Sequence, residues 1–269
     1  MALTILITGS TDGIGLASSQ ILASKGHRVL LHGRNESKAK RVANRLKVDY
    51  KVGVKPVWGD LSVMREVTAL SRQIKNLDQP IDVLINNAGI YLHKKEITPD
   101  GFEKTMAVNH FAVQLLTNLL LKNHLVNDCG RIIIVSSVAH KYANLNVNDL
   151  DFSQGFTGFK AYATSKLANI LFTKDLAKRL SSTNITVNSL HPGVIDTKLL
   201  RSGFDLRGAD VNKGSETSVF LALSPEISGV TGQYFVDCKK QKTSTLADSA
   251  ELASSLWERS EEKLKNFYS

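Results

Sequence analysis

The 269-residue chain has little cysteine and no long apolar segment. Its two cysteines, Cys129 and Cys238, are too few for the disulfide framework of a small secreted domain, so we expect a protein of a reducing compartment, the cytoplasm. No apolar run approaches the ~20 residues that a membrane-spanning helix needs. These two absences predict a soluble protein without an integral membrane segment.

The start of the chain lacks the basic leader of a signal peptide. Residues 3–8 instead form an apolar run typical of a buried strand, and a glycine-rich turn follows it directly. We therefore expect the N-terminus to be part of the fold.

The charge of the chain is unbalanced, because 34 Lys and Arg residues against 25 Asp and Glu residues leave a formal net charge of +9. Such an excess could attract nucleic acid or an anionic membrane. However, the basic residues are spread over predicted helices, and none of the basic stretches alternates with aromatic residues as in a nucleic-acid platform. We interpret the excess as solvated helix faces with some attraction for a polyanionic cofactor, and we expect no nucleic-acid partner.

Short runs rich in Ile, Val and Leu alternate with amphipathic stretches of ten residues or more. The runs predict strands at 3–8, 28–32, 52–58, 81–86, 131–136, 186–190 and 233–236. The stretches predict helices at 14–25, 36–47, 63–75, 101–124, 159–180 and 213–223. Nearly continuous apolar strands that alternate with helices are typical of a parallel sheet covered on both faces. The pattern predicts one α/β domain over residues 1–269, with a doubly wound parallel sheet of about seven strands.

Three further segments depart from this alternation. The polar segments at about 138–158 and 193–212 follow strands and are longer than ordinary connections. Ligands of open α/β sheets bind beyond the carboxyl ends of strands, so we expect substrate loops here, with plain surface loops as the alternative. The amphipathic stretch at about 246–268 predicts a C-terminal helix that packs on the body of the protein.

A glycine-rich turn connects the first predicted strand to the first helix. It consists of Gly9, Ser10, Thr11, Asp12, Gly13, Ile14 and Gly15, with the spacing G-x-x-x-G-x-G. Glycines permit a tight turn and a close approach to a pyrophosphate, and the helix N-terminus presents free N–H groups to the anion. Such a turn can also be a plain loop, but its place between a buried strand and a helix favours dinucleotide binding in a Rossmann-type fold.

The end of the second predicted strand indicates which dinucleotide is bound. NAD-binding folds place an acidic residue about 20 residues past the glycines, on the ribose 2′-hydroxyl. Here the strand ends without an acid, and Arg34 and Asn35 follow. A guanidinium suits a 2′-phosphate, whereas a carboxylate would repel it. We therefore expect NADP(H) rather than NAD(H), unless Arg34 is only a solvated loop residue.

Tyr162 and Lys166 lie one turn apart on the predicted helix 159–180. A phenol has a pKa near ~10, and a neighbouring ammonium favours the phenolate, so we expect Lys166 to lower the pKa of Tyr162. The pair could then exchange a proton with a carbonyl or alcohol oxygen. Ser136 and Ser137 end a preceding strand, where a hydroxyl could hold the same oxygen. Each pattern alone also occurs as a surface pair or as turn residues.

The order of these motifs resembles the short-chain dehydrogenase/reductase family along essentially the whole chain. The matching motifs are residues 8–15, Asp60-Leu61, Asn86-Asn87-Ala88-Gly89, Asn109, Val135-Ser136-Ser137, Tyr162-x-x-x-Lys166 and Pro192-Gly193. Segments 150–152, 165–172, 191–199 and 234–239 resemble, more narrowly, the retinol-dehydrogenase-like and WW-domain-oxidoreductase-like members.

The resemblance implies a catalytic tetrad of Asn109, Ser137, Tyr162 and Lys166. In it Tyr162 is the general acid/base, Lys166 lowers its pKa and binds the nicotinamide ribose, Ser137 holds the substrate oxygen, and Asn109 sustains a relay water. The resemblance also implies further cofactor contacts. These are Asp60 and Leu61 at the adenine, Asn87, Ala88 and Gly89 at the adenosine ribose, and Pro192, Gly193, Val194 and Thr197 at the nicotinamide.

We therefore expect an NADP(H)-dependent oxidoreductase that moves hydride between nicotinamide C4 and a carbonyl carbon. Apolar residues in the two loops predict a lipophilic substrate: Phe152, Phe156, Phe159, Leu199, Leu200 and Phe204. Many retinol dehydrogenases carry an N-terminal membrane anchor that this sequence does not show, which weakens a transfer of retinoid specificity. The family often pairs the helices 101–124 and 159–180 between subunits, so a homodimer or homotetramer stands beside a monomer as an expectation.

Two other functions fit parts of the pattern. A dinucleotide-binding regulatory or scaffold protein would keep the fold without turnover, but such proteins typically lose the tyrosine or the lysine. A nucleotide-sugar epimerase or dehydratase shares Tyr-x-x-x-Lys, but it usually needs a larger C-terminal domain than the tail after Val236 provides. His27, His93, His124 and His140 have no metal-ligand spacing, and we expect no metal.

Overall fold

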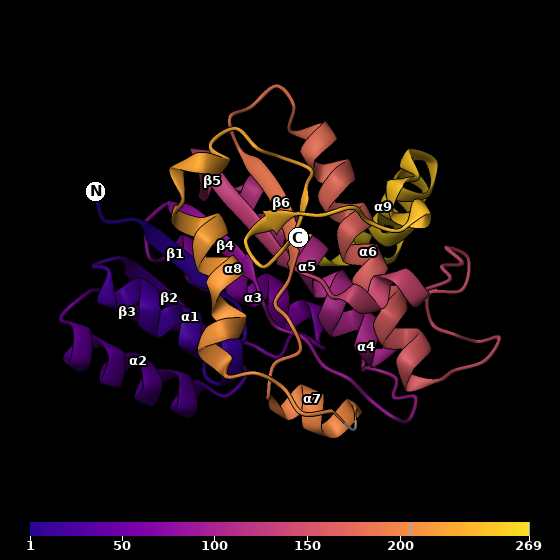
Figure 1. Cartoon of the computed structure of the whole chain (residues 1–269), viewed down its shortest axis with the longest axis horizontal. Coiled ribbons are helices and arrows are strands. Elements are labelled where there is room, and N and C mark those ends of the chain that lie inside the picture. The colour runs from indigo at the N-terminus through magenta and orange to yellow at the C-terminus, as the bar shows by residue number, and fades with distance from the viewer. Residues whose placement is uncertain (205, 269) are drawn as a thin grey trace.

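A single sheet organises the computed structural model, which describes residues 1–204 and 206–268 (Figure 1). Within these residues the sheet has eight strands in the order β3-β2-β1-β4-β5-β6-β7-β8. The strands are β1 (Thr4–Ile7), β2 (Arg28–Gly33), β3 (Val54–Trp58), β4 (Ile81–Asn86), β5 (Val126–Val135), β6 (Thr186–His191), β7 (Tyr234–Val236) and β8 (Lys239–Lys240). The strands from β3 to β7 run parallel, and β8 is antiparallel to β7. The order reverses between β1 and β4, where open α/β sheets bind ligands.

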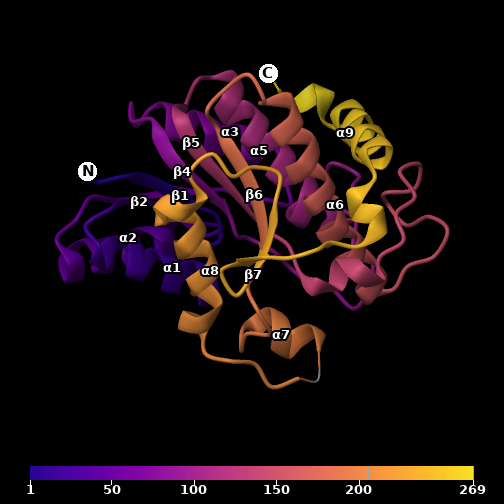
Figure 2. The same ribbon diagram turned by 45° about the horizontal axis from the view of Figure 1, so that its top comes forward.

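Helices cover both faces of the sheet (Figure 2). They are α1 (Gly13–Ser24), α2 (Glu36–Tyr50), α3 (Met64–Lys75), α4 (Lys104–Met106), α5 (Ala112–Lys122), α6 (Gly158–Arg179), α7 (Lys198–Gly203), α8 (Val211–Leu223) and α9 (Ala250–Leu264). Helices α1, α2 and α8 share an apolar cluster with one face of the sheet. Helices α3, α5 and α6 pack on the opposite face, and α9 packs against α6. The predicted doubly wound architecture is confirmed.

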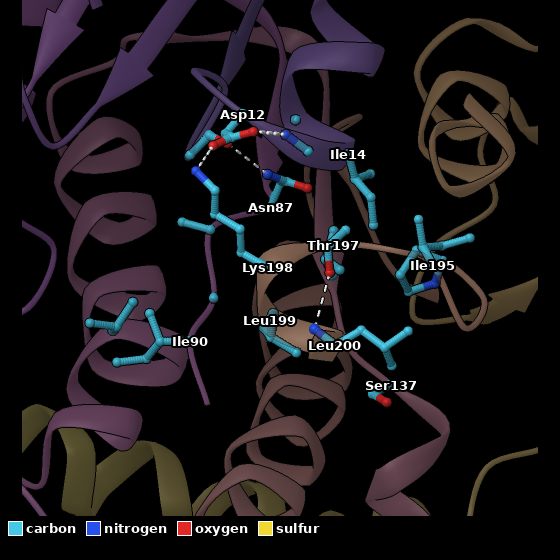
Figure 3. Close-up of a pocket in the computed structure, with 18 of the residues that line it drawn as sticks. Asp12, Ile14, Asn87, Ile90, Ser137, Ile195, Thr197, Lys198, Leu199 and Leu200 are labelled. Carbon is cyan, nitrogen blue, oxygen red and sulfur yellow. Dashed lines mark hydrogen bonds and ion pairs between the residues drawn. The ribbon is translucent and has the colours of Figure 1, made fainter. Parts of the chain in front are cut away.

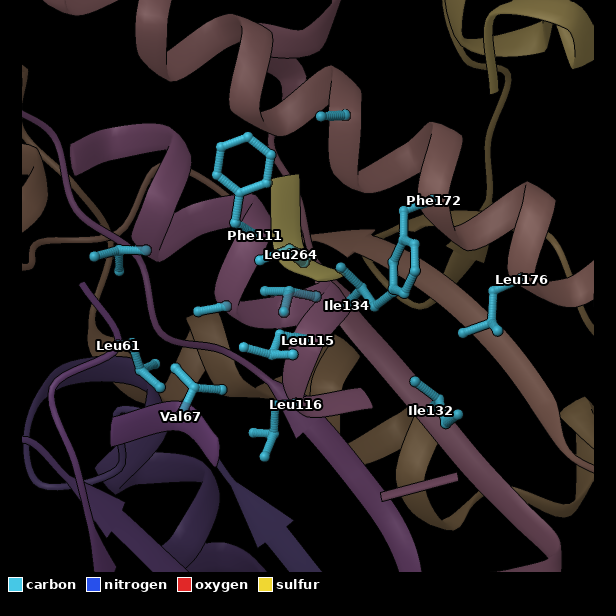
Figure 4. Close-up of a cluster of buried hydrophobic side chains, with 14 of the residues drawn as sticks. Leu61, Val67, Phe111, Leu115, Leu116, Ile132, Ile134, Phe172, Leu176 and Leu264 are labelled. Atoms are coloured by element: carbon cyan, nitrogen blue, oxygen red, sulfur yellow. The ribbon is translucent and has the colours of Figure 1, made fainter. Parts of the chain in front are cut away.

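Both faces of the central strands are buried, which explains why their sequences are nearly continuously apolar. In β1, Leu6 faces the cluster shared with α3, α5 and α6, whereas Ile5 and Ile7 face the cluster shared with α1 and α2. Truncation of one buried leucine in such a cluster typically costs about 2–5 kcal/mol. Figure 4 shows part of the larger cluster, where side chains from helices and strands interdigitate: Phe111, Leu115, Leu116, Ile132, Ile134, Phe172, Leu176 and Leu264.

The structure differs from the sequence expectation in four elements. The predicted helix 101–124 is divided into α4, a π-helical turn (Ala107–Phe111) and α5. Strand β5 begins at Val126 rather than at residue 131, and the short strand β8 adds to the predicted seven. The loop 193–212 contains α7. Among the described residues no helix is both long and apolar enough to cross a membrane.

Candidate active site

The glycine-rich turn lies between β1 and α1, at the carboxyl edge of the sheet. Gly9 and Gly13 have φ values of +65° and +53°, in the left-handed region that favours glycine. A Cβ atom on Gly15 would lie 2.4 Å from the carbonyl oxygen of Gly9, so a side chain cannot be accommodated there. The turn thus keeps its backbone bare at the helix N-terminus, as the approach of a pyrophosphate requires.

A cavity of about 980 Å³ extends along the carboxyl edge from this turn to the predicted catalytic residues (Figure 3). Its volume is at the upper end of the ~300–1,000 Å³ typical of ligand pockets. The predicted site residues that line it are Gly9, Asp12, Gly13, Ile14, Gly15, Arg34, Asp60, Leu61, Asn87, Ala88, Gly89, Ser137, Tyr162, Lys166, Pro192, Gly193, Val194 and Thr197. Positions far apart in the sequence therefore meet in one cleft.

Other predicted cofactor residues shape the cleft without lining it. The buried Ser10 hydroxyl donates a hydrogen bond to the carbonyl of Ile7 at 2.8 Å. Thr11 packs against Gly33, where a Cβ atom would lie 2.5 Å from its methyl carbon. Asn35 caps α2, because its Oδ1 accepts from the Lys38 N–H at 2.8 Å. These contacts fix the turn and the start of α2.

Two ammonium groups that the sequence analysis missed gather at the phosphate turn. Lys198 Nζ lies 2.5 Å and Lys38 Nζ 3.4 Å from Asp12 Oδ2. The hydrogen bond from Lys198 is the main cause that lowers the pKa of Asp12. Nearby, Arg34 lies 4.0 Å from Asp60 and keeps a largely exposed side chain. In the sequence, only the position of Lys38, four residues after Arg34 and in the first turn of α2, could have indicated a second cation here.

The end of β4 is tied to the phosphate turn by hydrogen bonds. Thr8 Oγ1 accepts from the backbone N–H groups of Asn87 and Ala88 at 3.0 and 3.1 Å. The Asn87 amide in turn donates to the Thr8 carbonyl at 2.8 Å. Gly89 faces Lys166, whose Nζ would lie 3.3 Å from a Cβ atom at this position. The Asn-Ala-Gly segment therefore joins the phosphate end of the cleft to its chemical end.

Tyr162 and Lys166 lie on α6, and both are buried. Lys166 Nζ donates to the Val135 carbonyl at 3.0 Å and lies 5.5 Å from the centre of the Tyr162 ring. Burial lowers the pKa of Lys166 to about 8. Burial also raises the pKa of Tyr162 to about 12, against the lowering effect of a hydrogen bond with Ser137. The expected lowering of the tyrosine pKa is thus wrong in this structure, because burial penalises the phenolate.

The two strand-end serines have different surroundings. The Ser136 hydroxyl donates to the carbonyl of Lys166 at 2.6 Å and is buried under α6. Both serines border the cavity, but Ser137 lies beside Tyr162, and its Oγ accepts from the Ala139 N–H at 3.2 Å. The Ser137 hydroxyl, and not the Ser136 hydroxyl that donates to Lys166, could therefore hold a substrate oxygen.

Asn109 lies in the π-helical turn and is completely buried. Its Oδ1 accepts from the Ile90 N–H at 2.8 Å, and its Nδ2 donates to the Ile90 carbonyl at 3.0 Å and to Ser165 Oγ at 3.0 Å. The side chain therefore holds the segment after Gly89 against α6. A π-helical turn inside a helix often accompanies a functional site.

The far end of the cavity has aromatic walls. The Phe204 ring lies 5.8 Å from the Tyr162 ring and 6.4 Å from the Phe159 ring. Of the apolar residues expected here, Phe159, Leu199, Leu200 and Phe204 line the cavity. The expectation for Phe152 and Phe156 is wrong, because they pack against each other and the larger core cluster.

Helix α7 spans the cleft and is held on both sides. Besides the Lys198–Asp12 ion pair, His93 Nε2 forms a hydrogen bond with the Ser202 carbonyl. Gly203 packs directly on Tyr91, since a Cβ atom there would lie 2.7 Å from the ring. Figure 3 shows Thr197, Lys198 and Leu199 between Asp12 and Ser137.

Comparisons with known proteins show the family of the chain. A family model described as short chain dehydrogenase matches residues 3–205. Retinol dehydrogenase 14 of Homo sapiens is 39% identical over an alignment of 285 positions. The alignment covers 96% of this chain and 85% of that protein.

Solved structures share the fold. An uncharacterized protein from Mycobacterium Paratuberculosis has a TM-score of 0.82 at 30% identity, covering 98% of this chain and 93% of that one. Gluconate 5-dehydrogenase from Burkholderia cenocepacia J2315, in complex with NADP and tartrate, has a TM-score of 0.71 at 26% identity, covering 87% of this chain and 92% of that one. The chain belongs to the short-chain dehydrogenase family, in its retinol-dehydrogenase-like branch.

Proposed function

We propose that the chain is an NADP(H)-dependent oxidoreductase that interconverts a carbonyl and an alcohol of a lipophilic substrate. The observation that carries this proposal is the continuity of one cavity, with the bare glycine turn at one end and Ser137, Tyr162 and Lys166 at the other. A dinucleotide whose pyrophosphate lies at the turn can extend along the cleft toward Tyr162. Both cysteines are free, which suits the reducing compartment, the cytoplasm, that we propose.

Each polar group at the chemical end has a proposed task. The bound nicotinamide supplies hydride transfer at C4. Ser137 donates a hydrogen bond to the substrate oxygen, and Tyr162 gives that oxygen a proton as negative charge develops on it. An ammonium has three donors, so Lys166 can hold a ribose hydroxyl while it bonds to Val135. Asn109 fixes the segment at Ile90, and we keep a relay water beside it as part of the proposal.

The Tyr162 hydroxyl is protonated at neutral pH, because burial raises its pKa to about 12. It can therefore act as the general acid in carbonyl reduction. In alcohol oxidation the same group would have to accept a proton, and the ratio of reduced to oxidised cofactor would decide which direction runs.

The charges near the phosphate turn support NADP(H) as the cofactor. Arg34 and Lys38 follow β2 within one helical turn of each other, where a 2′-phosphate would lie. The related gluconate 5-dehydrogenase structure contains NADP. The choice of a lipophilic substrate rests on exposed apolar side chains around the cavity: Val138, Tyr142, Phe159 and Leu206.

The experiment that tests the function is a Tyr162→Phe substitution. The assay uses NADPH and a series of aldehydes and ketones of increasing apolar chain length. We expect wild-type turnover that improves with chain length, and a loss of about 10²–10⁴-fold in the variant because the general acid is removed. The Kd of NADPH, from fluorescence titration, should stay within about twofold.

Tyr50→Phe, at the end of α2 and away from the cavity, is the matched control and should keep full activity. Near-normal turnover of Tyr162→Phe would remove Tyr162 from the mechanism. A wild type that binds NADPH but turns over no member of the series would point to a regulatory or scaffold protein.

A further inference from the structure

His140 is a buried histidine behind the active site that the proposed chemistry does not use. It lies in the 3₁₀ turn Val138–Tyr142, three residues after Ser137, and has no exposed surface. Its two ring nitrogens contact two backbone groups, one nearby in the sequence and one 104 positions later. Nδ1 lies 2.7 Å from the Ser137 carbonyl oxygen, and Nε2 lies 3.2 Å from the Ser244 nitrogen.

These two contacts define the tautomer of His140. A backbone carbonyl can only accept and a backbone N–H can only donate, so Nδ1 must carry the proton and Nε2 the lone pair. A protonated ring would direct a second N–H against the Ser244 N–H. Burial lowers the pKa of His140, which is consistent with a neutral ring. The ring therefore accepts a hydrogen bond from the Ser244 N–H at Nε2 and donates one to the Ser137 carbonyl from Nδ1.

His140 holds the Ser137 carbonyl twice. Its backbone N–H donates to this oxygen at 3.2 Å, in addition to the bond from Nδ1. The two donors occupy both lone pairs of the carbonyl and fix the peptide plane after Ser137. The Ser137 hydroxyl, which extends from this backbone toward Tyr162, is fixed with it.

The other side of His140 is anchored to the C-terminal region. Next to Ser244, Thr243 Oγ1 accepts from Lys174 Nζ at 3.0 Å and donates to Asp248 at 2.7 Å. Lys174 also pairs with Asp248 and belongs to α6, the helix that carries Tyr162. The segment that orients the imidazole is thus attached to the same helix as the proposed general acid.

A tyrosine ring packs against the remaining side of the His140 imidazole. The Tyr234 ring of β7 packs edge-on against the imidazole, with ring centres 5.1 Å apart. The Tyr234 side chain is itself buried. The imidazole therefore cannot tilt away from Ser137 without displacing a neighbouring ring.

We propose that His140 is a positioning residue for the substrate-oxygen contact of Ser137: a neutral Nδ1–H imidazole, oriented by Ser244, that sets the Ser137 backbone at a defined distance from Tyr162. The inference rests on the proposed function, because it assigns His140 to the reaction that Ser137 and Tyr162 perform. The competing interpretation is that His140 only fills space under the turn.

The first test is spectroscopic and needs no turnover. Nitrogen-15 shifts and ring-proton correlations of the imidazoles in the full-length protein report which nitrogen carries the proton. The His140 signals are assigned by their loss in His140→Asn. We expect the Nδ1–H tautomer at neutral pH. An Nε2–H tautomer, or a ring that exchanges between tautomers, would overturn the proposed connection.

The second test separates the two contacts of the imidazole. An asparagine side chain ends near the Nδ1 position and can still donate to the Ser137 carbonyl, whereas a glutamine ends near the Nε2 position and reaches toward Ser244. We expect His140→Asn to keep kcat within about threefold of wild type. His140→Gln and His140→Ala should lower kcat about 10- to 100-fold, as misplacement of a reacting group by ~1 Å does. The Kd of NADPH should stay within about twofold in all three.

Thermal unfolding of each variant shows whether packing alone explains the losses. If His140→Asn and His140→Gln lose kcat equally, or if kcat follows Tm across the series, His140 is a packing residue and the inference fails. In a Ser137→Ala background, the difference between Asn and Gln at position 140 should disappear, because the group that His140 positions is absent. A persistent difference would also overturn it.

His27 provides the matched control. Its Nδ1 accepts from the Leu3 N–H at 3.2 Å, in a half-buried place remote from the cavity. His27→Asn and His27→Gln should both leave kcat unchanged. A wild type without any turnover overturns the proposed function and the positioning role together. An active wild type with unaffected His140→Gln and His140→Ala overturns the positioning role only.

Discussion

Among single residues, the cations near the glycine-rich turn form only weak ion pairs. Arg34 is 75% exposed and 4.0 Å from Asp60, and Lys38 is 3.4 Å from Asp12. Exposed ion pairs of this kind contribute only about 0–1 kcal/mol. Both side chains can therefore leave their carboxylates at little cost and turn to a phosphate.

This looseness leads to a prediction about cofactor choice. Arg34→Ala should weaken NADPH binding about 10- to 100-fold, since a hydrogen bond to a charged group contributes about 1.5–3 kcal/mol. Lys38→Ala should act in the same direction and less strongly, because Lys38 makes a single point contact. NADH binding should change little in either variant. The measurement is fluorescence titration with both dinucleotides.

Arg45→Ala is the control for this prediction. Arg45 is exposed on α2, the helix of Lys38, and pairs with Asp49. If Arg34→Ala weakened NADPH and NADH equally, the guanidinium would not recognise the 2′-phosphate.

Among elements, α9 covers parts of α5 and α6, the helices at which we considered subunit pairing. Its Glu261 Oε1 accepts hydrogen bonds from Gln114 at 2.7 Å and Asn118 at 3.0 Å, both on α5. Trp257 of α9 stacks on Phe172 of α6, with ring centres 5.4 Å apart. The side-chain N–H groups of Gln114 and Asn118 and an aromatic surface of α6 thus find their partners within one chain.

We therefore predict that the protein is monomeric in solution. Light scattering coupled to size exclusion should give the mass of one chain over a wide concentration range. Glu261→Ala should leave the buried Gln114 amide without its acceptor and destabilise the fold by about 1–3 kcal/mol. Glu258→Ala, on the exposed side of α9, should not. A stable dimer in the wild type would show that subunits pair through another surface.

The elements also show what a sequence can and cannot predict. Strand β4 was expected at 81–86 and is found there, because a buried apolar run between turns leaves little choice. The π-helical turn at Ala107–Phe111 was missed, since its residues have ordinary helical periodicity and only the tertiary bonds of Asn109 to Ile90 reveal its role. Strand β8 has two lysines and no periodicity to detect.

The candidate site was predictable where motifs are local. The glycine turn and the Tyr162–Lys166 pair are continuous in sequence, and the structure brings them into one cavity. The predicted lowering of the Tyr162 pKa was wrong, because the pKa is raised by burial, and burial depends on the whole fold. The role of His140 depends on Ser244, 104 positions later, and no spacing rule connects the two.

In the whole molecule, several histidines are buried in the neutral state. Burial lowers the pKa of His32, His110 and His191 to about 4, from an ordinary value of 6.5. A histidine with a lowered pKa in the folded state binds protons more readily when unfolded. The stability that depends on keeping the ring neutral is therefore fully present above pH 6.5 and is lost as the pH falls toward 4. At about 1.4 kcal/mol per pH unit, each site contributes about 3 kcal/mol of this loss.

We predict that the free energy of unfolding decreases steeply between pH 6.5 and 4. Urea denaturation at several pH values measures it, and His110→Gln should flatten the dependence because one buried proton acceptor is gone. The buried Glu103, whose pKa is raised, acts in the opposite direction and reduces the slope. Constant or increasing stability on acidification would show that these histidines are protonated in the folded protein.

Helix α7 has a consequence for how the two proposed ligands would depend on each other. The same short helix pairs with Asp12 beside the phosphate turn and carries Leu199 and Leu200 into the other end of the cavity. The proposed dinucleotide and the proposed substrate would therefore contact one element, so we expect the binding of one to change the affinity for the other.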